Sequence, residues 1–227
     1  MLGVVVNAAA VILGGLLGML FGRLLNDRLA KAAMTGIGLC TLYIGFSGSL
    51  KSANPLILIA AMVLGAIAGT LLDLDGAVNR LGEKAQSLAR GRGGRVAEGF
   101  VTASLLFCVG AMAVTGSLDA GLRGDNATLY AKSALDFVAA ALLASTLGAG
   151  VLLSAATVIV YQGAIALAAG LIAPALTPQA VSEMAGTGSL LIVALGLNLL
   201  GITKIKVADL LPAILFAPVL TLIAGLF

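Results

Sequence analysis

The sequence predicts an all-α fold, a polytopic bundle of about eight transmembrane helices. Of its 227 residues, 60% are hydrophobic and only 10% are charged, whereas a soluble domain carries about 25% charged residues. Uncharged apolar stretches reach the roughly 20 residues that a helix needs to cross a bilayer. These stretches are continuous, whereas a membrane β-barrel shows short segments of alternating hydrophobicity.

The apolar stretches give the order of the predicted spans: residues 2–22, 32–50, 55–73, 98–116, 128–147, 150–171, 184–201 and 208–226. No positively charged region precedes the first stretch, so we expect a retained span rather than a cleaved signal peptide. We expect one transmembrane domain over 1–227. Its parts are a first repeat at 1–73, a cytoplasmic loop at 74–97, two central spans within 98–147 and a second repeat at 148–227.

The basic residues orient these spans. Ten of the thirteen lysines and arginines fall in the connections after spans one, three and seven, and short basic loops stay in the cytoplasm. The other three are Lys51, Arg123 and Lys132. Both termini are therefore expected on the external side. The net charge of +3 follows from this bias and requires no nucleic-acid partner.

The segment 74–97 holds five of the basic residues. Apolar residues recur in it at near-helical spacing, which predicts a short amphipathic helix on the inner membrane surface. A packed linker helix is the alternative. We expect the arginine cluster at 90–95 to meet anionic lipid headgroups.

Glycines recur every four residues in two spans. Gly14, Gly18 and Gly22 lie in span one, and Gly65 and Gly69 lie in span three. Small residues at this spacing let helix backbones approach closely, so we interpret them as packing positions. The alternative is that the first span bends or unwinds, as the broken helices of transporters do.

Two parts of the chain are similar to each other. Residues 3–12 align without a gap with residues 150–159, and a Pro-x-Ile-Leu-x-Ala motif begins at both Pro55 and Pro212. The shift is five spans, an odd number, so the repeats would face opposite ways. Inverted repeats are typical of secondary transporters, whose sites lie near the membrane midplane. Shared apolar composition is the alternative explanation.

Asp136 is the most informative single residue because it lies about two turns inside span five. A buried carboxylate is costly unless it is paired. Lys132 precedes it by four residues and can reach it along the same helix face. One interpretation is an ion or proton site. The other is a self-neutralising pair near the outer interface, with Lys132 snorkelling to water.

Uncharged polar residues mark further candidate positions of a polar path. Asn7 in span one and Tyr161 and Gln162 in span six either join helices or line such a path. Ser47 and Asn198 occupy matching positions in spans two and seven.

A Gly-Ser-Leu motif occurs three times and places serines at Ser49, Ser117 and Ser189. We expect all three motifs at external helix ends, where glycine and serine commonly cap. The alternative is an external vestibule of hydroxyls, in which the third motif starts a helix and favours an anion.

The sequence offers little for catalysis. It has no histidine, and its two cysteines, Cys40 and Cys108, lie in apolar stretches as small buried hydrophobes. No nucleophile with an adjacent base is recognisable. We therefore expect no enzymatic activity, no metal and no cofactor.

Three segments carry a resemblance to a known family: residues 1–7, 48–55 and 100–112. With them the chain resembles the YqgA/YdfK-like family of bacterial inner-membrane proteins, domain of unknown function 554, over essentially its whole length. The resemblance implies a location in the bacterial plasma membrane. It adds little on function, because the family is labelled at most as a candidate for transport and supplies no site residues.

Together these observations favour an inner-membrane transporter or channel for a small solute or ion. The alternative is a membrane scaffold or sensor that does not transport and recruits a partner or anionic lipid through the basic loop. The glycine-rich helix faces are compatible with a homo-oligomer.

Overall fold

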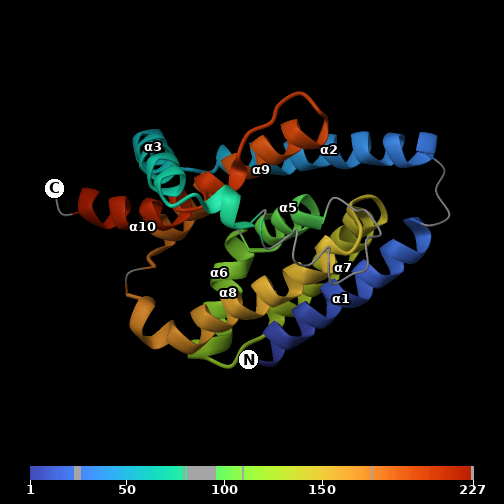
Figure 1. The fold of residues 1–227 in the computed structure, drawn as a ribbon. Helices are drawn as coiled ribbons and strands as arrows, with labels where there is room; N and C mark the ends of the chain where they lie inside the picture. The colour runs from blue at the N-terminus through green and yellow to red at the C-terminus, as the bar shows by residue number, and fades with distance from the viewer. Residues whose placement is uncertain (23–26, 79, 81–95, 109, 175, 226–227) are drawn as a thin grey trace.

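The computed structural model describes residues 1–22, 27–78, 80, 96–108, 110–174 and 176–225. All of the secondary structure in these residues is helical, which confirms the all-α prediction (Figure 1). The long elements are α1 (Leu2–Gly22), α2 (Asp27–Ser49), α3 (Pro55–Leu71), α5 (Val96–Cys108), α6 (Ala111–Leu122), α7 (Ala127–Leu147), α8 (Gly150–Ile172), α9 (Pro178–Leu199) and α10 (Ala213–Ala224), with a 3-10 turn η1 (Val207–Leu210) before the last.

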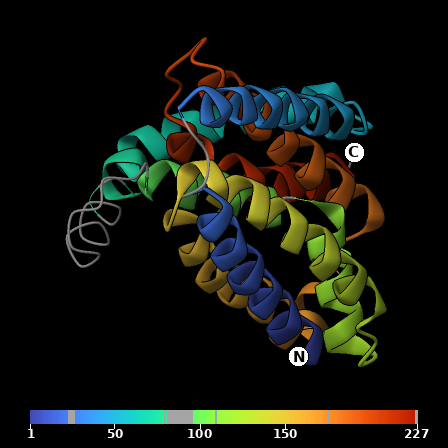
Figure 2. The same ribbon diagram turned by 90° about the vertical axis from the view of Figure 1, so that its right-hand side faces the viewer.

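The helices form two groups that face each other (Figures 1 and 2). In the first bundle, α1 packs along α7 and α8, and α8 packs along α5 and α6. In the second bundle, α2 packs along α9, and α10 lies against both α3 and α9. The α5–α6 pair also contacts α9, so it forms part of the boundary between the two bundles.

Glycines bring α1 onto the backbone of α7. A Cβ atom added to Gly14, Gly18 or Gly22 would lie between 2.1 and 2.4 Å from a carbonyl oxygen of α7. Those carbonyls belong, in the same order, to Phe137, Ala141 and Ser145. The helices therefore run parallel in van der Waals contact, which confirms the packing interpretation. Helix α1 is continuous from Leu2 to Gly22, so the alternative of an unwound first span is wrong.

The second glycine pair acts in the same way in the second bundle. A Cβ on Gly65 would lie 2.4 Å from the Ala213 nitrogen, and one on Gly69 would lie 1.9 Å from the Asp209 oxygen. No side chain larger than hydrogen fits there without a shift of the backbone. Helix α3 is thereby held antiparallel against η1 and α10.

Six helices within the described ranges are long and apolar enough to cross a membrane, or seven if the bent α5–α6 pair counts as one span. Helix α3 has 17 residues and falls just below that length, near the lower limit of about 17 for a membrane-spanning helix. Many large apolar side chains lie on the outer surface, for example Leu167 at 77% and Val160 at 70% exposure. Such a surface suits a lipid environment. The count of eight spans stays a prediction.

The boundaries of two predicted spans were wrong. The stretch 98–116 is not one straight helix, because α5 and α6 meet at a bend of 59°. The stretch 184–201 begins six residues too late, since α9 starts at Pro178 behind Thr177, whose hydroxyl accepts the Ala180 N–H. In the loop, residues 74–78 are helical; most of the predicted amphipathic helix, including the arginine cluster at 90–95, lies outside the described residues.

Candidate functional site

Four predicted site residues meet inside the first bundle, between α1, α7 and α8. They are Asn7, Lys132, Asp136 and Gln162, and we call them the polar cluster. All four are at most 6% exposed. The sequence places them on three helices far apart in the chain, and the antiparallel packing of α1 on α8 brings them together.

Lys132 and Asp136 form a buried ion pair along one turn of α7. The four-residue spacing predicts that Lys132 reaches Asp136 along one helix face, and this prediction is confirmed. The Lys132 ammonium also lies 5.9 Å from the centre of the Phe107 ring of α5, a favourable cation–π arrangement. Lys132 is only 5% exposed, so the interpretation that it snorkels to water is wrong.

Asn7 and Gln162 link α1 to α8 within the same cluster. The Asn7 amide donates to the Gln162 carbonyl oxygen at 3.3 Å, and Asn7 also lies beside the Asp136 carboxylate. The Asn7 Oδ1 and Gln162 Nε2 atoms have no hydrogen-bond partner in the described structure. A buried donor or acceptor without a hydrogen-bond partner costs about 1–3 kcal/mol. The cluster therefore presents one free acceptor and one free donor group.

Tyr161 and Cys108 lie next to the polar cluster, on α8 and α5. The Tyr161 hydroxyl is likewise buried without a partner among the described residues. Both side chains line an apolar cavity of about 240 Å³ against α10. Cys108 is buried as expected, but Cys40 is exposed on α2, so the expectation of burial was wrong for Cys40.

A second cavity, of about 590 Å³, lies between the two bundles, and we call it the Lys51 cavity. Lys51 is the one charged side chain among the described residues that line it. Two predicted site residues, Ser47 and Ser189, line it from α2 and α9. Its other polar lining residues are Tyr43, Thr115 and Ser182.

The Gly-Ser-Leu motifs do not all lie at helix ends. Ser49 is at the end of α2, where its hydroxyl donates to the Phe46 carbonyl at 3.1 Å. Ser117 and Ser189 lie inside α6 and α9, and each donates to the carbonyl four residues earlier, at 2.6 and 2.7 Å. The third motif therefore starts no helix, and the predicted anion site at its N-terminus is wrong.

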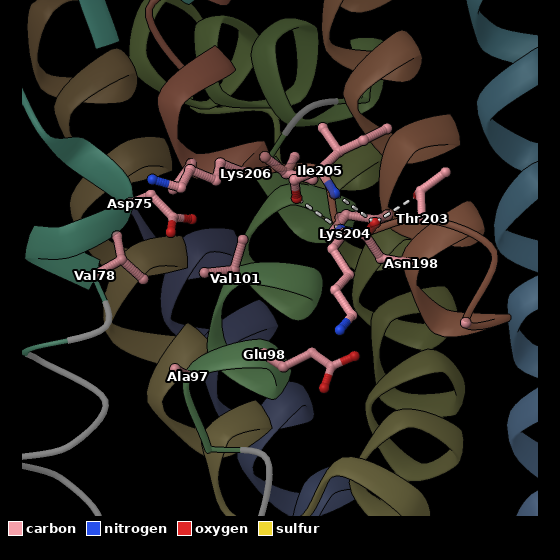
Figure 3. A pocket seen from close by; sticks show the side chains of 14 residues that line it. Asp75, Val78, Ala97, Glu98, Val101, Asn198, Thr203, Lys204, Ile205 and Lys206 are labelled. Atoms are coloured by element: carbon pink, nitrogen blue, oxygen red, sulfur yellow. Dashed lines mark hydrogen bonds between the residues drawn. The ribbon is translucent and has the colours of Figure 1, made fainter. Parts of the chain in front are cut away.

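A third cavity, of about 420 Å³, lies at the other end of α9, and we call it the Lys204 cavity. Four charged residues line it: Asp75, Glu98, Lys204 and Lys206. Figure 3 shows the Lys204 side chain extending towards Glu98 and that of Lys206 towards Asp75. The cavity thus carries two cations and two carboxylates.

Asn198 lines the Lys204 cavity but acts on the backbone. Its oxygen accepts the Thr203 hydroxyl at 2.7 Å and the Ile205 N–H at 2.9 Å, and its amide donates to the Ile205 carbonyl at 2.8 Å (Figure 3). These bonds fold the connection after α9 back on itself. Asn198 and its sequence counterpart Ser47 therefore lie in two different cavities.

Sequence reasoning missed two buried carboxylates. Glu183 is fully buried in α9 and accepts the Ser52 hydroxyl at 2.5 Å and the Ala53 and Asn54 N–H groups at 2.7 and 2.9 Å. Asp209 accepts the Asp75 N–H at 2.8 Å. The predicted span seven, residues 184–201, begins one residue after Glu183. The Thr-Pro pair at 177–178, typical of a helix start, was the signal that could have placed it inside.

The chain matches a family model described as "Protein of unknown function (DUF554)" over residues 2–222. It is 36% identical to "Uncharacterized protein YqgA" of Escherichia coli K12, over 95% of this chain and 94% of that protein. It is 30% identical to "Uncharacterized membrane protein YdfK" of Bacillus subtilis 168, over 100% of this chain and 98% of that protein. No solved structure matches significantly. The chain belongs to the DUF554 family.

Proposed function

We propose that this DUF554 protein is a transporter of a small solute or ion in the bacterial plasma membrane. The observation that supports this most is the polar cluster. Polar groups at membrane depth are costly and occur mainly where they serve a site. Here a charged pair is accompanied by an unpartnered acceptor on Asn7 and an unpartnered donor on Gln162. A purely structural pair would need neither.

The packing of the helices supports an inverted repeat. The counterparts on the sequence alignment, α1 with α8, α2 with α9 and α3 with α10, pack against one another. In each pair the contacts run antiparallel: Asn7 meets Gln162 while Gly15 meets Leu152. An axis in the membrane plane would produce this arrangement, and many secondary transporters are built in this way.

The α2–α9 contacts support the proposed repeat in more detail. Leu42 and Gly45 align with Val193 and Gly196 at a constant shift along the sequence. A Cβ on Gly45 would meet Val193, and one on Gly196 would meet Leu42. Each contact is thus the image of the other under an exchange of the two repeats. Superposing α1–α3 on α8–α10 tests the proposal, and a rotation axis along the membrane normal would contradict it.

The proposed orientation has both termini outside. It follows from the ten basic residues on the connections that lie opposite Lys51 and Arg123. A topology reporter fused after Phe227 should read external, and one inserted at Gly93 should read cytoplasmic. The reverse pair of readings would contradict the orientation, and two readings on one side would contradict the odd number of spans, five, predicted between Gly93 and Phe227.

Flux through proteoliposomes tests the transport function. We expect the wild type to move at least one of protons, sodium, chloride or acetate, and Asp136→Asn to abolish that flux or its pH dependence. Asp119→Asn is the matched control because its carboxylate also faces a cation four residues away, but at the surface. A wild type that moves none of these ions yet binds anionic vesicles would favour the scaffold alternative.

A further inference from the structure

The Lys51 and Lys204 cavities share the same two walls. Helix α9 lines the first with Ala185 and Ile192 and the second with Leu195 and Asn198. The α5–α6 pair lines the second with Val101 and the first with Leu106 and Gly110. The two cavities therefore follow one interface, between α9 and the bent span, from opposite ends.

One continuous face of α9 connects them. Its lining positions recur every three or four residues from Pro178 to Asn198, the spacing of a single helix face. Twenty residues of α-helix extend about 30 Å, which equals the hydrocarbon thickness of a bilayer. The interface lined by both cavities thus has the length of a complete membrane crossing.

A thin apolar septum separates the cavities. On α9 the nearest lining positions, Ile192 and Leu195, are three residues apart in sequence, and on α5 those positions, Val101 and Leu106, are five residues apart. At 1.5 Å per residue these distances are about 5 and 8 Å. Leu105 lies between the lining positions of α5, and Ile192 and Leu195 border the gap on α9; all three belong to one buried hydrophobic cluster.

We propose that the interface between α9 and the α5–α6 pair is the solute route, closed at the septum, and that the solute is a small organic anion entering beside Lys51. This inference rests on the proposed transport function. The route differs from the polar cluster, because neither Lys132 nor Asp136 lines either cavity.

The chemistry of the Lys51 cavity sets the solute class. Lys51 gives the cavity one positive charge, and no lining carboxylate among the described residues balances it. Ser47, Thr115 and Ser182 add hydroxyls to a mainly apolar wall, and the Ser182 hydroxyl donates to the Lys51 carbonyl at 3.0 Å. A volume of about 590 Å³ lies in the range of small-molecule sites, roughly 300–1,000 Å³. An apolar wall with one cation and several hydroxyls suits a carboxylate with a small apolar body.

Helix α5 couples this route to the polar cluster. Its Leu106 faces the Lys51 cavity, whereas its neighbour Phe107 lies over the Lys132 ammonium. A change at the Lys132–Asp136 pair that shifts Phe107 would therefore shift the same turn of α5 that borders the septum.

Cysteine labelling tests the route. In a Cys40→Ala/Cys108→Ala background, Ala185→Cys should react with a membrane-impermeant thiol reagent from one face of the membrane only. Val101→Cys should react from the opposite face only. Val160→Cys, on the lipid-exposed side of α8, is the control and should stay unlabelled. Equal protection of Ala185→Cys and Val160→Cys, or labelling of both route cysteines from one face, would overturn the route.

Ion selectivity tests the solute class. Ile192→Ser places a hydroxyl in the septum and should produce a passive leak in proteoliposomes that favours chloride over potassium. Adding Lys51→Glu should reverse that preference. Leu167→Ser, the control on the lipid-exposed face of α8, should leave the vesicles tight. An unchanged preference in the double variant would overturn the anion assignment. If Ile192→Ser does not fold, thermal unfolding tests the anion assignment instead. Acetate, but not ammonium, should raise the unfolding temperature of the wild type, and Lys51→Gln should abolish that effect.

The two proposals fail separately. Loss of flux in Asp136→Asn with no cysteine labelling would leave the transport function and remove this route. Labelling from opposite faces with normal flux in Asp136→Asn would keep the route and remove the polar cluster as the transport site.

Discussion

Asp136 and Glu183 are both buried carboxylates on long helices, but their surroundings differ. Glu183 accepts three hydrogen bonds from residues 52–54 at the start of α3, and no described cation forms an ion pair with it. Asp136 is neutralised by Lys132 instead, and the amide groups of Asn7 and Gln162 around it are left partly unpartnered. Burial alone therefore does not identify a site. A carboxylate satisfied by backbone donors ties two helices together, whereas one among unpartnered groups has capacity for a ligand.

The largest expected effect concerns Asp136. Asp136→Asn leaves the Lys132 ammonium buried without its partner, which should lower the free energy of unfolding by about 3–5 kcal/mol. Replacing both residues with Met removes both charges and should restore most of that loss. Chemical unfolding in detergent micelles measures both variants. A double variant as unstable as the single one would show that the pair is required for packing.

Flux separates the two roles of the pair in the same experiment. A stable double variant without flux would support Asp136 as part of the transport site. Full flux in the double variant would contradict any role for Asp136 in transport.

The second prediction concerns Glu183. Glu183→Gln replaces charge-assisted hydrogen bonds from the Ser52 hydroxyl and two backbone N–H groups by weaker ones. Because bonds to charged groups contribute about 1.5–3 kcal/mol each, we expect a loss of about that size in the free energy of unfolding. Flux per folded molecule should stay unchanged. Loss of flux in a fully folded Glu183→Gln variant would contradict the structural role.

Ser52→Ala serves as the graded control for Glu183. It removes the hydroxyl donor but keeps the two backbone donors from Ala53 and Asn54. Its loss of unfolding free energy should be about 1.5 kcal/mol, the lower limit for one hydrogen bond to a charged group. A loss equal to that of Glu183→Gln would show that the Ser52 hydroxyl bond alone accounts for the destabilisation by Glu183→Gln.

The third prediction concerns the glycine stripe that positions Asp136. Gly18→Ala brings a Cβ within 2.1 Å of the Ala141 oxygen, so α1 must move away from α7 at a cost of about 1–3 kcal/mol. The matched control is Gly36→Ala on α2, where a Cβ would meet nothing within 4 Å. There, alanine should stabilise the helix by up to about 1 kcal/mol. Equal effects of the two substitutions in thermal unfolding would contradict tight packing of α1 on α7.

The sequence predicts the parts of this structure that depend on local spacing. The Lys132–Asp136 pair follows from a four-residue separation on one helix, and the Gly14 and Gly18 contacts follow from small residues at the same spacing. Contacts across the bundle depend on which helices become neighbours. Apolar stretches carry no signal for that choice, so neither the meeting of Asn7 with Gln162 nor the Lys51 cavity could be derived.

Helix boundaries limited the sequence reasoning as well. Glu183 was missed because hydropathy ends a span at the first charge, although α9 continues through that residue in a buried environment. The bend between α5 and α6 occurs inside a continuous apolar stretch. Hydropathy alone cannot distinguish a bent helix from a straight one.

The smallest expected effect compares two ion pairs with the same spacing. Arg123 lies 3.7 Å from Asp119, with side chains 76% and 38% exposed, whereas both partners of the Lys132–Asp136 pair are below 10% exposed. Water screens the first pair, so Asp119→Asn should change the free energy of unfolding by less than about 1 kcal/mol. A double-mutant cycle over each pair measures the two coupling energies directly. We expect a small, salt-sensitive coupling for Asp119–Arg123 and a larger, salt-insensitive one for Lys132–Asp136, because mobile ions reach only the exposed pair. Equal salt sensitivity would mean that water reaches Asp136, and the buried pair would then belong to a hydrated path.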